Sequence, residues 1–193
     1  MLEPQQTAFI LASASPRRAE ILRTLGVAFE TAPSDVNEAP VDGETPSEYV
    51  TRVARAKAAA VDRESGLVIG ADTVVVVDGH TLGKPTDDAD AERMLRLLSG
   101  RWHAVMTGIC LRDAADGREV CDHEKTLVRF RDLTGEEIAG YVASGEPRDK
   151  AGAYAIQGRG MLLIDEIAGN YHNVVGLPPT LLARLARQFG VIL

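Results

Sequence analysis

The order of strand-like and helix-like segments is the feature of this sequence that most constrains its fold. Strand-like and helix-like segments alternate through the first hundred residues, and two long strand-like segments then flank a predicted turn at Asp116-Gly117. This order is typical of a mixed, twisted α/β sheet with flanking helices. The expected helices are 16–25, 46–63, 87–99, 134–144 and 178–189. The expected strands are 8–13, 28–32, 67–79 (whole, or broken near Gly70), 103–112, 118–130, 153–157 and 161–167.

Composition narrows the class of protein. The chain has 193 residues, of which 45% are hydrophobic, enough for one large domain or two closely joined lobes. Its net charge of −7 argues against general binding of nucleic acid or of anionic membranes. No apolar run approaches the length of about 20 residues that crosses a membrane. Residues 1–9 lack the features of a secretory signal, so a cytoplasmic protein is expected.

The cysteines and histidines give weak signals. Cys110 and Cys121 flank the predicted turn and could be neighbours across two strands. We favour two reduced, buried thiols in a reducing compartment over a disulfide. No cysteine or histidine cluster has zinc-binding spacing, and the four scattered histidines are expected to be structural or solvated.

The helix predicted from residue 16 begins unusually. Ser15 suits the N-cap and Pro16 the first helical position, but Arg17 and Arg18 follow. A helix N-terminus carries partial positive charge and unpaired N–H groups, so two arginines there oppose the helix dipole. This arrangement predicts an anionic partner for them.

Two charged residues interrupt apolar patterns. Lys57 falls on the apolar stripe of the second predicted helix, where it must either extend to solvent or meet an anion. Asp72 interrupts a buried strand, so its carboxylate should be paired, metal-bound or protonated unless it caps a turn at the strand end. Gly70 and Ala71 are expected to leave space for a ligand beside Asp72.

Three further residues are weak signals individually. Lys84 lies in a Gly-Lys-Pro loop, and Glu38 lies in a loop where a glutamate is usually only solvated. Gln157 lies in a predicted strand rich in small residues. Its amide would either make a buried structural hydrogen bond or contact the edge of a nucleobase.

Together, these residues indicate a phosphate-handling enzyme. Phosphate suits a cluster of arginines and lysines at a helix N-terminus, and the carboxylates of Glu38 and Asp72 could hold Mg²⁺. Neither a P-loop nor a dinucleotide-binding glycine motif is present. The residues alone predict metal-assisted phosphate chemistry and leave the substrate open.

The motifs LASASPRR, EYVTRVARAK, GADTVV, GKP and DKAGAYAIQG occur in this order. In this combination the chain resembles the Maf family of nucleoside triphosphate pyrophosphatases, also called septum formation inhibitors, over nearly its whole length. The resemblance implies a single domain over 1–193, with two lobes around a substrate cleft and a fold related to inosine triphosphate pyrophosphatase. It also implies hydrolysis to the monophosphate and pyrophosphate with Mg²⁺ or Mn²⁺.

The resemblance also implies roles for individual residues. Lys57, Asp72 and Lys84 match catalytic positions, and Glu38 and Asp72 match metal-binding positions. The family's SxSxRR motif falls on Ser13, Ser15, Arg17 and Arg18. The substrate-binding matches are Ser13, Arg17, Arg18, Thr73 and Gln157, of which Arg17, Thr73 and Gln157 are tied to base choice. The string DKAGAY followed by IQG resembles the branch that acts on dTTP and UTP in nucleotide-pool house-cleaning.

Other interpretations remain open at this point. The same chemistry could act on a purine or modified nucleotide such as 7-methyl-GTP, whose branch carries an acidic residue in place of Gln157. A non-enzymatic nucleotide sensor in septum formation would bind without turnover. A purely structural domain would leave the inward-facing cations unexplained. The resemblance also allows a homodimer.

Overall fold

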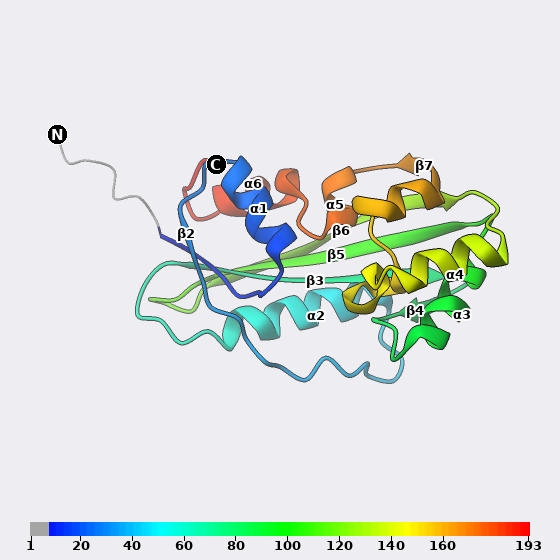
Figure 1. The fold of residues 1–193 in the computed structure, drawn as a ribbon. Helices are drawn as coiled ribbons and strands as arrows, with labels where there is room; N and C mark the ends of the chain where they lie inside the picture. Colours follow the sequence, from blue (N-terminus) through cyan, green and yellow to red (C-terminus); the bar gives the residue numbers. More distant parts are fainter. Residues whose placement is uncertain (1–7) are drawn as a thin grey trace. The chain divides into compact units, whose positions relative to one another are not determined.

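The computed structural model describes residues 8–193 (Figure 1). The prediction that residues 1–9 lack a secretory signal falls mostly outside the described residues. The strands are β1 Phe9–Leu11, β2 Phe29–Thr31, β3 Leu67–Val77, β4 His80–Leu82, β5 Trp102–Asp113, β6 Glu119–Phe130 and β7 Ile164–Ala168. The α-helices are α1 Pro16–Thr24, α2 Pro46–Ala59, α3 Asp88–Leu98, α4 Gly135–Ala143, α5 Tyr171–Val175 and α6 Pro179–Arg187. Short 3-10 helices are η1 Glu146–Asp149, η2 Ala151–Ala153 and η3 Gly158–Leu163.

The strands form one mixed sheet. Their order among the described residues is β2-β1-β3-β5-β6-β7, with β4 paired to β3. β1 runs parallel to both of its neighbours, with Leu11 opposite Thr31 on one side and Ile69 on the other. β4 is antiparallel to β3, and β7 is antiparallel to β6. The predicted mixed α/β sheet with flanking helices is confirmed.

Contacts divide the chain into two compact units. The first contains the described residues up to Asp72, together with Thr107–Glu124 and Gly176–Leu193. The second contains Thr73–Met106 and Lys125–Val175. The long strands β3, β5 and β6 therefore contribute residues to both units. The expectation of a single domain over 1–193 stays a prediction.

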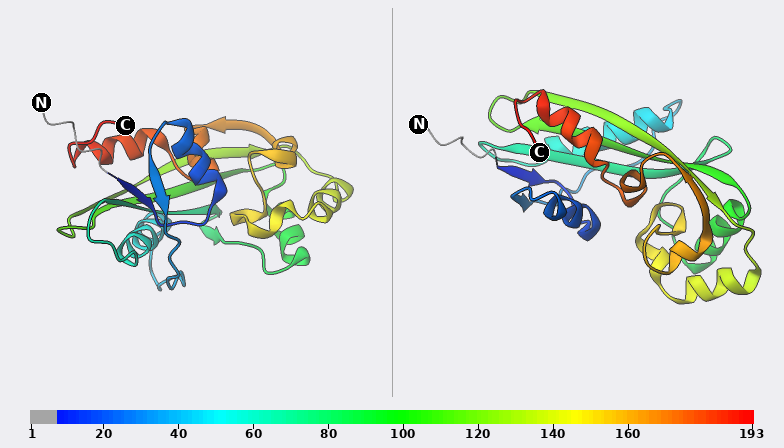
Figure 2. Two further views of the ribbon diagram at one scale, coloured as in Figure 1. Left: turned by 60° about the vertical axis from the view of Figure 1, so that its left-hand side comes forward. Right: turned by 90° about the horizontal axis from the view of Figure 1, so that it is seen from above.

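In the first unit, the backbone of α2 packs directly against the sheet. A Cβ atom built on Gly70 of β3 would lie 2.0 Å from the Ala54 carbonyl oxygen. One built on Gly108 of β5 would lie 2.3 Å from the Val50 carbonyl oxygen. Figures 1 and 2 show α2 along one face of these strands and α6 along the other. The expected ligand space at Gly70 is therefore wrong, because α2 fills it.

The second unit has its own hydrophobic core. Residues of β3, β5 and β6 pack there against α3, α4 and the 3-10 helices. Three rings, His103, Phe130 and Tyr154, meet edge to face with centroids 4.7 to 5.3 Å apart. The Nε2 atom of His103 lies 2.7 Å from the Tyr154 hydroxyl oxygen. The expectation of a structural role suits this buried histidine.

Most element boundaries agree with the sequence prediction, with one large exception. Strands were expected over 153–157 and 161–167, but residues 151–153 and 158–163 form 3-10 helices, and β7 begins only at Ile164. Gly152 and Gly158 adopt φ values of 68° and 69°, which break an extended strand. The short elements β4 and α5 were not predicted from the sequence.

Two smaller boundary questions are settled. Gly70 does not break the long strand, because β3 runs without interruption from Leu67 to Val77. Helix α2 ends at Ala59 rather than near residue 63. The chain leaves the helix through a tighter turn, in which the Val61 N–H donates to the Ala58 carbonyl oxygen, and Val61 becomes buried.

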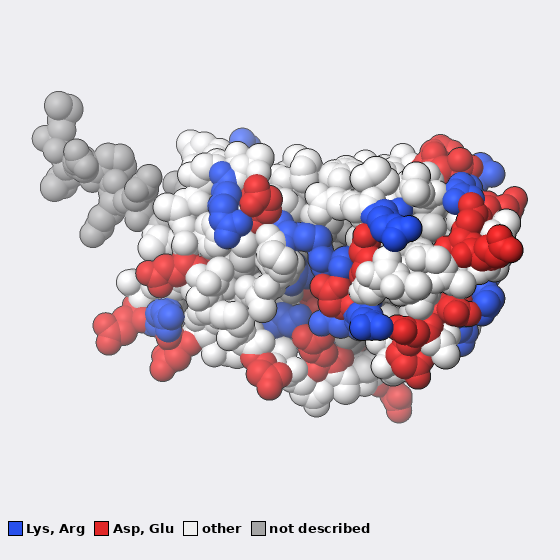
Figure 3. All heavy atoms as spheres, viewed as in Figure 1, with Lys and Arg blue, Asp and Glu red and all other residues white. Residues whose placement is uncertain are grey.

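The surface carries charges of both signs. On the face drawn in Figure 3, lysine and arginine side chains are interspersed with aspartate and glutamate. This mixture accords with the net charge of −7. Within residues 8–193, no helix combines the length and the apolar character needed to cross a membrane.

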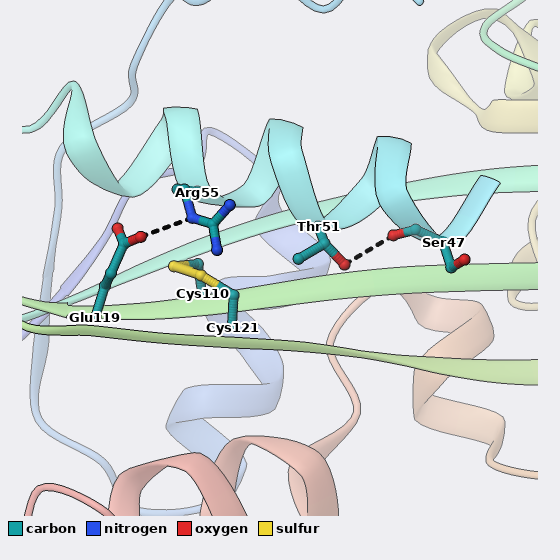
Figure 4. Close-up of a disulfide and its surroundings, with 6 residues drawn as sticks. All are labelled: Ser47, Thr51, Arg55, Cys110, Glu119 and Cys121. Carbon is teal, nitrogen blue, oxygen red and sulfur yellow. Dashed lines mark hydrogen bonds and ion pairs between the residues drawn. A yellow bond between two sulfur atoms is a disulfide. The ribbon is translucent and has the colours of Figure 1, made fainter. Parts of the chain in front are cut away.

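The cysteine prediction is wrong. Cys110 on β5 and Cys121 on β6 form a disulfide, because the two strands place their Cα atoms 4.0 Å apart. Figure 4 shows the bond beneath α2, beside the ion pair of Arg55 and Glu119. The Arg55 Nε atom lies 2.7 Å from Glu119 Oε1. The disulfide joins two adjacent strands of the first unit.

Candidate active site

The start of α1 has the geometry that its sequence predicts. The Ser15 side chain accepts a hydrogen bond from the Arg18 N–H at 3.4 Å, and Pro16 occupies the first turn. No acidic residue stands in that turn. The N-cap prediction is confirmed.

Arg18 donates hydrogen bonds to three places in the first unit. Its Nε atom donates to the Gly176 carbonyl oxygen at 2.8 Å. Its Nη1 atom donates to the Ala71 carbonyl oxygen at 2.9 Å and to Ser13 Oγ at 3.1 Å. Burial lowers the pKa of Arg18, an effect that the nearby carboxylate of Asp72 opposes. Arg18 therefore joins the end of β1 to β3 beside an acidic group.

Lys57 lies between two carboxylates. Its Nζ atom is 2.7 Å from Asp72 Oδ1 and 2.8 Å from Glu38 Oε1. Lys57 and Asp72 are only 9% and 7% exposed, whereas the Glu38 side chain is 48% exposed. The alternative in which Lys57 extends to solvent is therefore wrong. Asp72 is paired, as a buried carboxylate should be.

The close packing of α2 explains why Lys57 and Asp72 meet. Gly70 and Asp72 are two positions apart on β3, so their substituents share the sheet face that α2 covers. Because the helix backbone touches Gly70, a lysine on the inner face of α2 reaches the adjacent carboxylate. The charged residue on the apolar stripe of α2 and the charged residue in the apolar strand β3 therefore lie at the same place in the structure.

Two residues that the sequence analysis did not select hold the loop that carries Glu38. Tyr49 Oη donates to the Glu38 carbonyl oxygen at 2.8 Å. Arg52 donates to the Ala39 carbonyl oxygen at 3.0 Å and forms a bidentate pair with Glu44 at 2.6 and 2.8 Å. Since these contacts involve loop atoms outside any regular pattern, helical periodicity could not reveal them.

The environment of Tyr49 reflects the nearby acidic groups. Burial raises the pKa of Tyr49 to about 12, and the carboxylates of Asp72 and Glu38 add to this effect. The phenol therefore stays protonated through the neutral range and remains a donor to the Glu38 backbone. Tyr49 is a support for the position of Glu38.

The remaining predicted site residues belong to the second unit. Thr73 follows Asp72 directly in β3, and Lys84 lies exposed between β4 and α3. Gln157 precedes η3 and is also exposed. The expectation that Gln157 lies in a strand is wrong, and the alternative of a buried structural amide is wrong as well. The Gly83 carbonyl oxygen accepts a hydrogen bond from the Gly152 N–H at 3.0 Å, which links the Gly-Lys-Pro loop to η2.

The acidic pair suits a hard divalent cation. Oxygens of Glu38 and Asp72 both approach the Lys57 ammonium group within 2.8 Å, so the two carboxylates converge on one region of the first unit. Mg²⁺ is commonly held by one or two carboxylates together with substrate phosphates. The donor set therefore fits the metal that the sequence predicts.

Comparisons with known proteins cover almost the whole chain. A family model described as Maf-like protein matches residues 8–189, a range that includes every predicted site residue. A dTTP/UTP pyrophosphatase of Symbiobacterium thermophilum is 51% identical over 183 residues, 94% of this chain and 93% of the relative. A dTTP/UTP pyrophosphatase of Geotalea uraniireducens is 50% identical over 185 residues, 95% of each chain. The solved structure of a HAM1 protein from Coxiella burnetii gives a TM-score of 0.45 at 19% identity, covering 64% of this chain and 73% of that one.

Proposed function

This chain belongs to the Maf family, and from that premise we propose that it hydrolyses dTTP and UTP to the monophosphate and pyrophosphate. Relatives at about half identity over nearly the full length bear the name dTTP/UTP pyrophosphatase. The structural observation that carries the proposal is the buried Lys57 ammonium group between the carboxylates of Glu38 and Asp72. The proposed cellular role is house-cleaning of the nucleotide pool.

We propose Glu38 and Asp72 as the protein ligands of a divalent cation, Mg²⁺ or Mn²⁺. When bound, such an ion neutralises phosphate charge and lowers the pKa of a coordinated water molecule. The convergence of the two carboxylates supports this assignment. The partial exposure of Glu38 lets its carboxylate exchange Lys57 for another cation without burying a new charge.

The reaction proposed for the site is attack of water on the α-phosphorus. The water oxygen forms a bond to that phosphorus, the bond to the bridging oxygen breaks, and pyrophosphate leaves. Asp72 accepts the proton of the water, and the Lys57 contact at 2.7 Å fixes the direction of its carboxylate. Lys57, Lys84, Arg17 and Arg18 supply positive charge that favours the departing pyrophosphate.

We assign base choice to Gln157, together with Thr73 and Arg17. An amide offers a donor and an acceptor, which complement a carbonyl oxygen and the adjacent N–H group on the edge of uracil or thymine. The exposure of Gln157 leaves its side chain accessible to a ligand. Replacing Gln157 by Glu should weaken use of UTP and dTTP relative to other nucleotides, and unchanged relative rates would contradict this assignment.

The decisive experiment is a hydrolysis panel with Mg²⁺ or Mn²⁺. dTTP, UTP, CTP, dGTP, ITP and 7-methyl-GTP are compared, and pyrophosphate and orthophosphate are scored separately. Pyrophosphate released mainly from dTTP and UTP is the expected result. Orthophosphate as the main product would show that another phosphorus is attacked. Preference for 7-methyl-GTP would overturn the substrate assignment, and tight binding without turnover would establish a sensor.

A further inference from the structure

The Glu146 carboxylate is the centre of a compact set of hydrogen bonds in the second unit. Its Oε2 atom accepts from the Arg159 N–H at 3.0 Å, and its Oε1 atom accepts from the Gly160 N–H at 3.0 Å. The hydroxyl of Tyr141 also donates to Oε1, at 2.9 Å. One partly buried side chain thus fixes the backbone that follows Gln157.

The same hydroxyl group holds the backbone that precedes Gln157. Tyr141, which is buried on α4, accepts a hydrogen bond from the Ala155 N–H at 3.2 Å while it donates to Glu146. The segment 155–160 is therefore held on both sides of Gln157 by two side chains that are bonded to each other. We call these two residues, Tyr141 and Glu146, the loop clamp.

Two glycines allow this segment to approach the loop clamp closely. A Cβ atom on Gly158 would lie 2.7 Å from Glu146 Oε2, and Gly158 has a φ of 69°. A Cβ atom on Gly160 would lie 2.1 Å from the Ala155 carbonyl oxygen. The turn is therefore folded tightly against the carboxylate. Backbone atoms exclude a side chain at Gly160, and the positive φ disfavours one at Gly158.

The charge of Glu146 accords with this geometry. Burial raises its pKa, but the N–H groups of Arg159 and Gly160 and the Tyr141 hydroxyl outweigh that effect and leave the pKa below its usual value. The group therefore stays ionised at neutral pH. An ionised carboxylate makes stronger hydrogen bonds to backbone N–H groups than a neutral acid does.

We propose that Glu146 is a positioning residue for nucleobase selection, acting through Gln157. An amide distinguishes uracil from cytosine only if its donor and acceptor point in a fixed direction, since turning the group over exchanges them. Among residues 8–193 no side chain holds the exposed Gln157 amide, so its direction depends on the backbone that the loop clamp fixes. The inference rests on the proposed function, since it needs Gln157 to contact the base.

The test compares kcat/KM for UTP with that for CTP in Glu146→Ala. We expect the UTP/CTP ratio to fall about tenfold, the effect of losing one well-directed hydrogen bond. The fall should come from a higher KM for UTP, with kcat at saturation within about twofold of the original. Glu136→Ala is the matched control, because Glu136 is an exposed glutamate on the same part of the chain, in the first turn of α4.

A double-mutant cycle with Gln157→Ala separates positioning from a general structural effect. If Glu146 acts through Gln157, its replacement causes no further loss of the UTP/CTP ratio once the amide has been removed. An equal loss in both backgrounds would overturn the inference. Tyr141→Phe keeps the buried ring but removes the bridging hydroxyl. If Glu146→Ala does not fold, the same cycle is run with Tyr141→Phe, and the loss of the UTP/CTP ratio is again compared with and without the Gln157 amide.

The outcomes for the two proposals are distinguishable. A wild-type protein without preference for UTP over CTP would refute the proposed function itself. A preference that falls in Gln157→Ala but persists in Glu146→Ala and Tyr141→Phe would refute only the role of the loop clamp. Thermal melting of each variant shows whether a changed ratio belongs to a folded protein.

Discussion

At the scale of single residues, the two carboxylates beside Lys57 differ in their surroundings. Asp72 is held in the sheet beneath α2, whereas Glu38 lies on a loop and keeps about half of its side chain exposed. A buried charge that loses its partner destabilises a protein far more than an exposed one does. The Lys57–Asp72 pair is therefore the fixed part of the site, and Glu38 is the part that can adjust.

Replacing Asp72 by Asn should remove catalysis and lower stability without unfolding the protein, because Glu38 Oε1, at 2.8 Å, still pairs with Lys57. The amide is similar in size but has no negative charge for Lys57, for a divalent cation or for the proton of water. We expect kcat for UTP to fall at least about 100-fold. Pyrophosphate release measures the loss of kcat, and the far-ultraviolet circular dichroism spectrum of the same preparation shows whether the protein remains folded.

The matched control is Asp62→Asn. Asp62 is exposed after the end of α2, and only its backbone carbonyl oxygen makes a described hydrogen bond. Activity should be unchanged in this variant. If Asp72→Asn keeps more than a tenth of the original turnover, Asp72 does not have the central role assigned to it.

At the scale of elements, the sequence specified those parts whose signals are local. The helices expected from residues 46 and 134 form, and α2 and α4 each begin with a capping box, in which a Thr and a Glu three positions later satisfy two N–H groups reciprocally. Lys57 was found on an apolar stripe, and Asp72 was found as a break in an apolar strand. Both signals are visible because buried positions recur at regular intervals in the sequence, so that a charged residue at such a position stands out.

The elements that the sequence did not specify depend on contacts between distant backbone atoms. Strands were predicted over 153–157 and 161–167, yet glycines with positive φ and the carboxylate of Glu146 fold most of the chain from 151 to 163 into turns. Tyr49 and Arg52 likewise hold a loop by donating hydrogen bonds to the carbonyl oxygens of Glu38 and Ala39. Cys110 and Cys121 were recognised as neighbours, but spacing could not distinguish paired sulfur atoms from free thiols.

The contact between α2 and β3 gives a prediction for Gly70→Ala. The added Cβ atom would lie 2.0 Å from the Ala54 carbonyl oxygen, so α2 must move away from the sheet. We expect a loss of about 3 kcal/mol in the free energy of unfolding. Activity should also fall, because moving the helix withdraws Lys57 from Asp72. Urea unfolding and UTP hydrolysis measure the two effects.

Gly140→Ala is the control for this change. Gly140 lies within α4, where an added Cβ atom meets nothing within 4 Å. The same chemical substitution should there stabilise the protein by up to about 1 kcal/mol, since alanine favours a helix more than glycine does. Similar losses in both variants would show that the contact at Gly70 has no special importance.

At the scale of the whole molecule, a buried histidine should make stability depend on pH. Burial lowers the pKa of His103 to about 4, and the residue is only 3% exposed. In the unfolded chain the imidazole has a pKa near 6.5. As the pH falls from about 6.5 toward 4, the unfolded state binds a proton that the folded state does not, so stability decreases through this window.

The expected size of this effect follows from the two pKa values. Between pH 7 and pH 5, His103 should contribute a loss of about 2 kcal/mol in the free energy of unfolding. Urea unfolding at both pH values, compared with His103→Gln, isolates that contribution because the acidic groups are common to both proteins. The exposed His80→Gln variant should keep the full loss. An equal loss in His103→Gln would assign the acid sensitivity to other groups.

The hydrogen bond from Arg18 to the Gly176 carbonyl oxygen has a consequence for how the molecule is made. The first unit contains Lys57 and Asp72, but it also needs strand residues 107–124 and the chain from Gly176 onward. A ribosome delivers these segments in order, with the second unit's residues emerging between them. The unit that contains Lys57 and Asp72 therefore cannot assemble on a nascent chain until residues past 176 have been released. An enzyme of this topology gains activity only after residues past 176 have left the ribosome, when the intervening segments have had time to fold.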